Sequence, residues 1–132
     1  MVAIKINRGK VFDIYTLEQN GRCELLDFLI ALKASSWQDF ARITKLFDYM
    51  AENGRIRNEQ KFKRLTPDIQ EFKTFGGVRV LCFFDGRSIV VLTNGFKKKK
   101  KYADEITRAE NMRLSYLNAK REGCLTYREE NL

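Results

Sequence analysis

The residues in this sequence best suited to chemistry are basic, and they lie in and directly after two adjacent apolar runs. Arg79 stands alone in the run VRVLCFF, and five lysines, Lys97–Lys101, follow the run SIVVLTNGF. A guanidinium group inside an apolar strand is costly unless a partner satisfies it. Two explanations are open for Arg79: a salt bridge to Asp85, Glu71 or another carboxylate, or a concave surface where a bound phosphate completes its hydrogen bonds.

The lysine run Lys97–Lys101 predicts affinity for a polyanion. Five adjacent side chains cannot all face one ligand, so a solvated turn or a general polyanion patch is the simpler interpretation. Crowded like charges also favour the loss of one proton, and a neutral lysine can act as a base. Tyr102 follows the run and could stack on a nucleobase or transfer a proton, although a tyrosine at a helix start is often merely partly buried.

Missing residue types narrow the chemistry further. The chain has no histidine, which excludes a Ser-His or Cys-His nucleophile, a histidine-based ribonuclease pair and a conventional zinc hydrolase site. It has no glycine-rich phosphate loop, and its carboxylates are scattered rather than clustered as in a two-metal nuclease. A nuclease with this sequence would therefore be metal-independent, need no cofactor, and use Lys, Arg and Tyr.

Length and charge indicate a single basic domain. The chain has 132 residues, of which 44% are hydrophobic, and a formal net charge of +8. Two domains would each have too small a core, so we expect one domain over residues 1–132, with loosely held ends at residues 1–8 and 123–132. Such a chain attracts polyanions, either nucleic acid or an acidic membrane surface.

The cysteines and the apolar runs predict a soluble cytoplasmic protein. Cys23, Cys82 and Cys124 are odd in number and widely spaced, which indicates neither a disulfide framework nor a zinc site. Charged residues interrupt the first thirty positions, and no apolar run approaches the roughly 18 residues that a membrane span needs. We therefore expect reduced thiols and no membrane partner.

Hydrophobic spacing in the first half predicts one strand followed by two helices. Residues 11–17, VFDIYTL, have the composition of a strand, and VAIKI at residues 2–6 is either a short extra strand or a frayed start. Leucine and phenylalanine spacing predicts a helix over residues 25–34. A second helix starts after Ser36, which has capping-box spacing to Asp39, and ends at Asn53-Gly54. We interpret Trp37 and the phenylalanines of this helix as core packing.

The second half is predicted to form a basic connection, three strands and a helix. Residues 55–67 are interpreted as a surface connection whose basic residues either extend a cationic face or form a solvated loop. Residues 69–75 predict a strand, and Asp85-Gly86 predicts a hairpin that would pair Arg79 with Leu92 if its loop has two residues. Charge order and apolar spacing predict a final helix over residues 104–121.

The order of segments from Phe62 to Leu117 resembles a known family. The segments are KFKRLTPDIQEFKTF, the strand VRVLCFFD, the strand IVVLTNGF, the lysine cluster and the helix EITRAENMRLSYL. They resemble the HigB-like, phage-related branch of the RelE/ParE toxin superfamily. The resemblance implies an α+β fold in which a small twisted antiparallel sheet packs against two N-terminal helices, with a C-terminal helix.

The resemblance also implies an activity: a type II toxin that cuts mRNA in the ribosomal A site, contacts rRNA and is neutralised by a cognate helix-turn-helix antitoxin. In such mRNA endoribonucleases the 2'-hydroxyl attacks the adjacent phosphate, which requires a base, charge stabilisation and an acid. By position, Arg79 would stabilise the phosphorane charge, and Lys73 would be a base or phosphate clamp. Lys98 and Lys99 would bind phosphate or assist proton transfer, and Tyr102 loosely matches an aromatic acid-base or stacking residue.

The remaining basic residues near this segment are predicted to bind RNA. They are Lys61, Lys63, Arg64, Lys97, Lys99, Lys100 and Lys101. The segment KKKYADE departs from the lysine pair followed by Thr and Lys-Thr-Pro that is common in this branch. Two alternatives stay open: a ParE-like toxin that inhibits gyrase, since one fold supports several activities, and a noncatalytic phage-derived nucleic-acid-binding protein.

Overall fold

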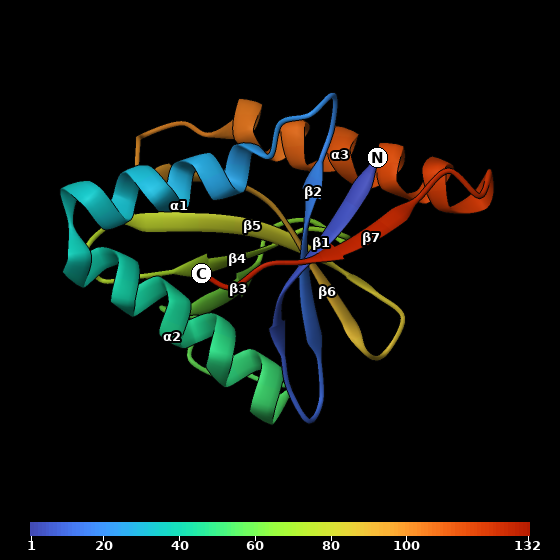
Figure 1. The fold of residues 1–132 in the computed structure, drawn as a ribbon. Helices are drawn as coiled ribbons and strands as arrows, with labels where there is room; N and C mark the ends of the chain where they lie inside the picture. Colours follow the sequence, from blue (N-terminus) through green and yellow to red (C-terminus); the bar gives the residue numbers. More distant parts are fainter.

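Seven strands and three helices make up the chain in the computed structural model, which describes residues 1–132 (Figure 1). In chain order they are β1 (Val2–Arg8), β2 (Asp13–Glu18), α1 (Glu24–Ser35), α2 (Trp37–Asn53), β3 (Phe62–Arg64), β4 (Gln70–Lys73), β5 (Val78–Asp85), β6 (Ile89–Lys97), α3 (Ala103–Arg121) and β7 (Thr126–Glu129). None of the three helices is both long and apolar enough to cross a membrane.

The strands form one mixed sheet in the order β3-β4-β5-β6-β2-β1-β7. The pairs β2–β6 and β1–β7 are parallel, and the other pairs are antiparallel. The predicted fold, a small antiparallel sheet with two N-terminal helices, is therefore wrong. Two strands precede the helices, because Ala3, Ile4 and Ile6 of VAIKI are buried and the segment pairs with β2 instead of fraying. The resulting β1–β2 hairpin joins the sheet alongside β6.

Both ends of the chain, expected to be loosely held, contribute strands to this sheet. Residues 1–8 contain β1, and residues 123–132 contain β7, which pairs in parallel with β1 from Val2↔Thr126 to Lys5↔Glu129. All four residues of β7 are exposed. Backbone hydrogen bonds and ion pairs from Lys5 and Arg8 to Glu129, rather than apolar burial, hold this edge strand.

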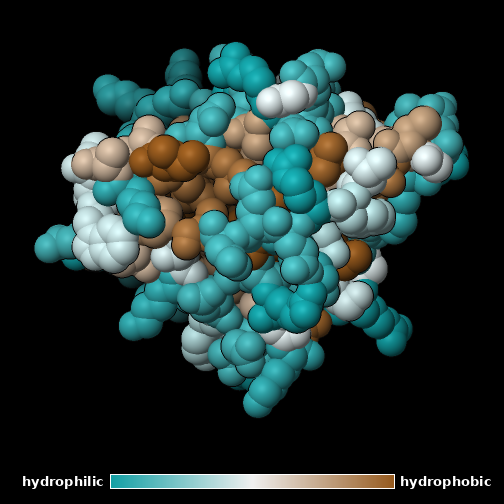
Figure 2. All heavy atoms as spheres, in the orientation of Figure 1, coloured by the Kyte–Doolittle hydropathy of each residue, from teal (hydrophilic) through white to brown (hydrophobic).

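Helices cover both faces of the sheet. On β5, Val78, Val80 and Cys82 point into a core shared with α1 and α2, whereas Leu81 and Phe83 point into a second core shared with α3. In Figure 1, α1 and α2 meet at a sharp corner on the left, and α3 runs along the upper right. Figure 2 shows a mostly hydrophilic surface in this view, with apolar side chains gathered over α1.

The two middle helices are also confirmed, with one exception in their packing. The Ser36 hydroxyl accepts a hydrogen bond from the Asp39 N–H at 3.3 Å, and Gly54 ends α2 in the left-handed conformation with φ 75°. Trp37, expected in the core, is 62% exposed. It lies in the first turn of α2, where its ring packs on the Phe40 ring at 5.7 Å between centroids, under the Lys33 ammonium group.

The predicted hairpin is present, but its register differs. Asp85 pairs with Ile89, which leaves a loop of Gly86, Arg87 and Ser88, and the register shifts again at a bulge between Val80 and Cys82. Asp85 extends β5 because its carboxylate accepts hydrogen bonds from the Tyr116 hydroxyl at 2.6 Å and the Lys120 ammonium at 2.7 Å. Arg79 is consequently opposite Phe96 rather than Leu92.

Close packing of α1 on β6 gives a first testable prediction. A Cβ atom at Gly95 would lie 2.5 Å from Cδ2 of the Phe28 ring. Gly95→Ala is therefore expected to destabilise the protein by about 1–3 kcal/mol through overpacking, measured by urea unfolding. Combining it with Phe28→Leu should cost less than the sum of the two single changes. If the changes in the free energy of unfolding caused by Gly95→Ala and Phe28→Leu are strictly additive, a clash with the Phe28 ring is not the cause of the destabilisation.

Candidate functional site

Strand pairing brings the predicted catalytic residues of β4 and β5 onto one face of the sheet. Lys73 is paired with Arg79, and Arg79 is paired with Phe96 of β6. Phe96 belongs to the core shared with α3. Because directly paired residues share a face of the sheet, Lys73 and Arg79 lie on the α3 side. Glu71, two residues before Lys73, lies on the same side.

Arg79 is buried, with 7% of its surface exposed, and forms no salt bridge. Its Nη1 group donates to the carbonyl oxygens of Thr74 at 3.1 Å and Val78 at 3.0 Å. These bonds tie the guanidinium to the turn between β4 and β5. The proposed salt bridge to Asp85 does not form, since that carboxylate bonds to α3. Nη1 makes both of the side chain's hydrogen bonds, so the rest of the guanidinium keeps donors for a ligand.

Glu71 is the buried acid at the centre of this region. Only 1% of its surface is exposed, its Oε2 atom has no hydrogen-bond partner, and its Oε1 atom is 4.0 Å from the Lys73 ammonium. Burial raises the pKa of the Glu71 carboxyl, and the nearby charges of Lys73, Arg79 and Lys63 oppose this effect without cancelling it. A carboxyl that holds its proton more tightly than usual is suited to acid-base work near neutral pH.

Tyr102 reaches the same place from the start of α3. It occupies the N-cap position, and its ring packs against the Phe96 ring at 5.3 Å between centroids. Burial raises the pKa of the Tyr102 hydroxyl, and the adjacent Glu71 carboxyl raises it further, whereas Arg79 lowers it. We call Glu71, Lys63, Lys73, Arg79 and Tyr102 the Glu71 cluster. Three of its members, Lys73, Arg79 and Tyr102, are predicted catalytic residues.

The lysine run does not behave as one uniform patch. The Lys97 ammonium bonds to the Asp39 carboxylate at 2.7 Å, and the Lys99 ammonium bonds to the Glu105 carboxylate at 2.8 Å. The bond from Lys97 lowers the pKa of Asp39. For Glu105, burial raises the pKa, but hydrogen bonds from Lys99 and Asn94 outweigh burial and the net change is downward. Each of these two lysines is thus held by a carboxylate of the chain itself.

The other three lysines of the run are exposed and pair with no acidic side chain. They are Lys98, Lys100 and Lys101. The backbone N–H of Lys98 donates to the Gly77 carbonyl at 2.6 Å, which seats this residue beside the β4–β5 turn. No hydrogen bond or ion pair joins its side chain to the Glu71 cluster. Its predicted catalytic role, like the RNA-binding role of its neighbours, stays a prediction.

The basic residues expected on a surface connection separate into different environments. Arg64 donates to the carbonyl oxygens of Thr66 at 3.2 Å and Pro67 at 2.7 Å, so it stabilises its own loop. Lys63 lies in β3 opposite Glu71 and belongs to the Glu71 cluster. Lys61 is exposed and lies near α2. The connection therefore contains a strand, β3, that the sequence did not indicate.

Glu71 was missed as a functional residue, because the sequence raised it only as a partner for Arg79. A signal was present in the alternation of QEFK. Phe72 packs in the core shared with α1 and α2, which places Glu71 and Lys73 on the opposite face. A glutamate facing the same side as a buried arginine in the next strand is the pattern that would have identified it.

The Glu71 cluster combines two kinds of group in one place. Lys63, Lys73 and Arg79 supply positive charge for an anion, and the Glu71 carboxyl and Tyr102 hydroxyl can exchange a proton. Together these are the components that phosphodiester chemistry needs without a metal: charge stabilisation and proton transfer.

A family model matches more than half of the chain. Residues 30–114 match the family described as phage-derived protein Gp49-like (DUF891). The matched segment contains every member of the Glu71 cluster, as well as α2 and the strands β3 to β6. No curated protein matches the chain.

The buried carboxyl predicts a pH-dependent stability. Folding raises the pKa of the Glu71 carboxyl above 4.5. The contribution of this group to the free energy of unfolding is therefore fully present below pH 4.5 and is lost as the pH rises through the folded-state pKa. Glutamine does not ionise, so in Glu71→Gln this loss of stability at higher pH does not occur. At pH 7 the variant should be more stable than the original chain by on the order of 1 kcal/mol, and the difference should vanish near pH 4.

Urea unfolding between pH 4 and pH 8 measures this effect. The control is Glu122→Gln, an exposed glutamate outside any ion pair, whose stability should follow the original chain at every pH. A Glu71→Gln variant that is less stable than the original chain at pH 7 would show that the three cations outweigh burial.

Proposed function

The chain belongs to the phage-derived Gp49-like family, and we propose that it is the toxin of a type II toxin-antitoxin system that cleaves mRNA on the ribosome. The family is associated with toxin-antitoxin systems. The partners in this proposal are ribosome-bound mRNA with its rRNA surroundings, and a cognate helix-turn-helix antitoxin. The observation that supports RNA cleavage best is the Glu71 cluster, in which cations surround an acid and a tyrosine on one face of the sheet.

In cleavage by 2'-hydroxyl attack, the cations of the Glu71 cluster stabilise the charge that develops on the phosphate. The attack places extra negative charge on the phosphate oxygens, which requires positive groups already in position. Arg79 is held rigidly by the Thr74 and Val78 carbonyls and retains free donors. Lys73 lies beside it on β4. We assign both residues to the phosphate that is attacked.

Proton transfer falls to Tyr102 and Glu71. Tyr102 is partly exposed, whereas Glu71 is buried, so of these two residues Tyr102 is the one that contacts the 2'-hydroxyl. The Tyr102 oxygen accepts the proton from the 2'-hydroxyl as its own proton passes to the Glu71 carboxylate. The 2'-oxygen bonds to phosphorus, and the bond to the 5'-oxygen breaks. In this scheme the ammonium group of Lys98 protonates the leaving oxygen, and the product is a 2',3'-cyclic phosphate.

Tyr102→Phe gives the sharpest test of this function, because it removes only the hydroxyl group. We expect induction of the original chain to arrest growth and to cut mRNA within codons, only on transcripts that ribosomes engage. Tyr102→Phe should lower the cleavage rate by about 10²–10⁴-fold with little change in stability. Primer extension on transcripts translated in a purified system measures the rate. Tyr127→Phe, a matched change at an exposed tyrosine of β7, should leave it unchanged.

The alternatives predict different outcomes from the same expression experiment. Intact transcripts together with accumulating gyrase-DNA breaks would identify a gyrase-inhibiting toxin, and normal growth would identify a noncatalytic nucleic-acid-binding protein. A folded Tyr102→Phe variant that cuts at the full rate would refute the proposed proton transfer. Arg79→Ala is less specific, because it also removes the hydrogen bonds that hold the β4–β5 turn.

A further inference from the structure

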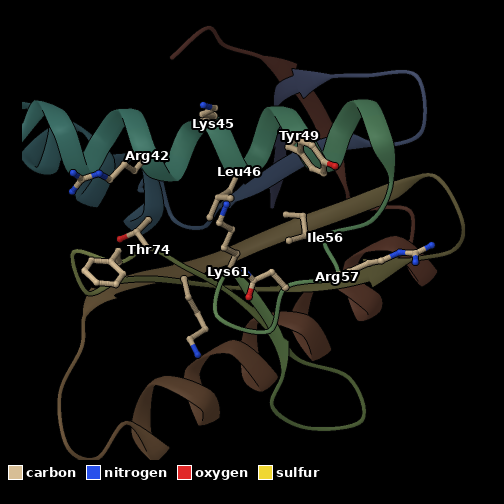
Figure 3. A pocket seen from close by; sticks show the side chains of 11 residues that line it. Arg42, Lys45, Leu46, Tyr49, Ile56, Arg57, Lys61 and Thr74 are labelled. Carbon is tan, nitrogen blue, oxygen red and sulfur yellow. The ribbon is translucent and has the colours of Figure 1, made fainter.

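A second surface feature lies beside the Glu71 cluster, on the α2 side of the molecule. A groove with a volume of about 540 Å³ separates α2 from residues 56–61 and from the β4–β5 turn. Figure 3 shows Arg42, Lys45 and Tyr49 spaced along α2, with Ile56 and Lys61 facing the helix from the other wall. Lys73 and Thr74 line the end of the groove that adjoins the β4–β5 turn. We call this feature the α2 groove.

The charge of the α2 groove has one sign. The ionised side chains along it are Arg42, Lys45, Arg57, Lys61 and Lys73, and none of the lining residues is acidic. Arg42 is 3.6 Å from the Asp39 carboxylate, and Lys73 is 4.0 Å from Glu71. The other three form no salt bridge. A concave surface lined by cations, three of them unpaired, concentrates anions, and a polyanion most of all.

Two aromatic rings border these cations. Tyr49 is half exposed, and Phe75 is fully exposed at the tip of the β4–β5 turn. The turn that carries Phe75 is tightly held: the Thr74 carbonyl accepts from Arg79, and Gly76 packs so closely on Asp39 that a Cβ atom would collide with it. The Phe75 ring is therefore presented to solvent by a rigid turn, and an apolar ring in this setting is suited to stacking.

We propose that the α2 groove binds a single-stranded RNA segment that continues from the phosphate held at the Glu71 cluster. Phosphates bind the cations, and bases stack on Phe75 and Tyr49, which is how single-stranded nucleic acid is held without sequence preference. Lys73 lines one end of the groove, while its ammonium group lies near Glu71 on the α3 side of the sheet. A strand that occupies both sites therefore passes around the end of the sheet at the β4–β5 turn. An acidic peptide would use the cations but would leave Phe75 uncovered. The inference rests on the proposed function for the identity of the strand as substrate.

Binding of an uncleavable RNA tests the groove separately from catalysis. The probe is a fluorescein-labelled 2'-O-methyl RNA of about 12 nucleotides, which lacks the attacking hydroxyl, and binding is followed by fluorescence anisotropy. Lys45→Glu with Arg57→Glu should raise Kd at least tenfold more than Lys10→Glu with Arg87→Glu. The control pair changes the net charge equally at exposed positions outside the groove.

A separate variant tests whether bases stack on the Phe75 ring. Phe75→Ala should raise Kd by roughly tenfold, whereas Leu114→Ala, which removes an exposed apolar side chain from α3, should have no effect. Circular dichroism checks that each variant is folded, and all the substituted side chains are exposed.

Three outcomes would overturn the inference. Equal weakening by both charge-reversal pairs, with no effect of Phe75→Ala, would mean general attraction of polyanions. Retained RNA binding in the groove variants would place the strand elsewhere. Poly-glutamate serves as a second probe: if the original chain binds it and the groove variants do not, the groove is assigned to an acidic protein segment. Groove-dependent binding by a protein that leaves cellular mRNA intact would refute the proposed function while the groove inference stands.

Discussion

The constraint on which the rest of the structure depends is that β5 is covered on both faces. Helices α1 and α2 pack on one side of the strand and α3 packs on the other, so any polar group in β5 must be satisfied by its immediate neighbours. Arg79 meets this demand through two carbonyl oxygens of the adjoining turn, and Glu71 in β4 meets it only partly, through surrounding positive charge. The Glu71 cluster lies where α3 begins, and there the partly exposed Tyr102 gives the sheet face access to solvent.

The local features of the fold could be predicted from the sequence, and the long-range ones could not. Helical spacing and the Ser36 cap located α1 and α2 because these signals involve neighbouring residues. The pairing of β1 with β7 was missed because it joins residues more than a hundred positions apart. The hairpin register was missed because α3 holds Asp85 within β5. In the site, Arg79 and Lys73 stood out by charge, whereas Glu71 gains meaning only from its neighbours across the sheet.

The distribution of charge says more about the molecule than its total. A formal charge of +8 and a run of five lysines suggest one dense cationic surface. The structure instead uses Lys97 and Lys99 to hold Asp39 and Glu105, so these two cations anchor the run to α2 and α3. Positive groups without acidic partners are also found along the α2 groove. Lys61 and Lys73 were candidates for the site by their charge, but the groove itself could not be predicted because three separate segments form it.

The pairing of β1 with β7 has a consequence for the order in which the molecule assembles. Contacts between distant residues cost more loop-closure entropy than local ones and tend to form later in folding. The hairpin of β5 and β6 joins neighbours in the chain, whereas β7 pairs with β1, more than a hundred residues away. Since β7 buries none of its residues, its docking adds little to the core. The strands β4 to β6, which carry Glu71, Lys73 and Arg79, can thus form first, and the outer edge at β7 is expected to form last and open first.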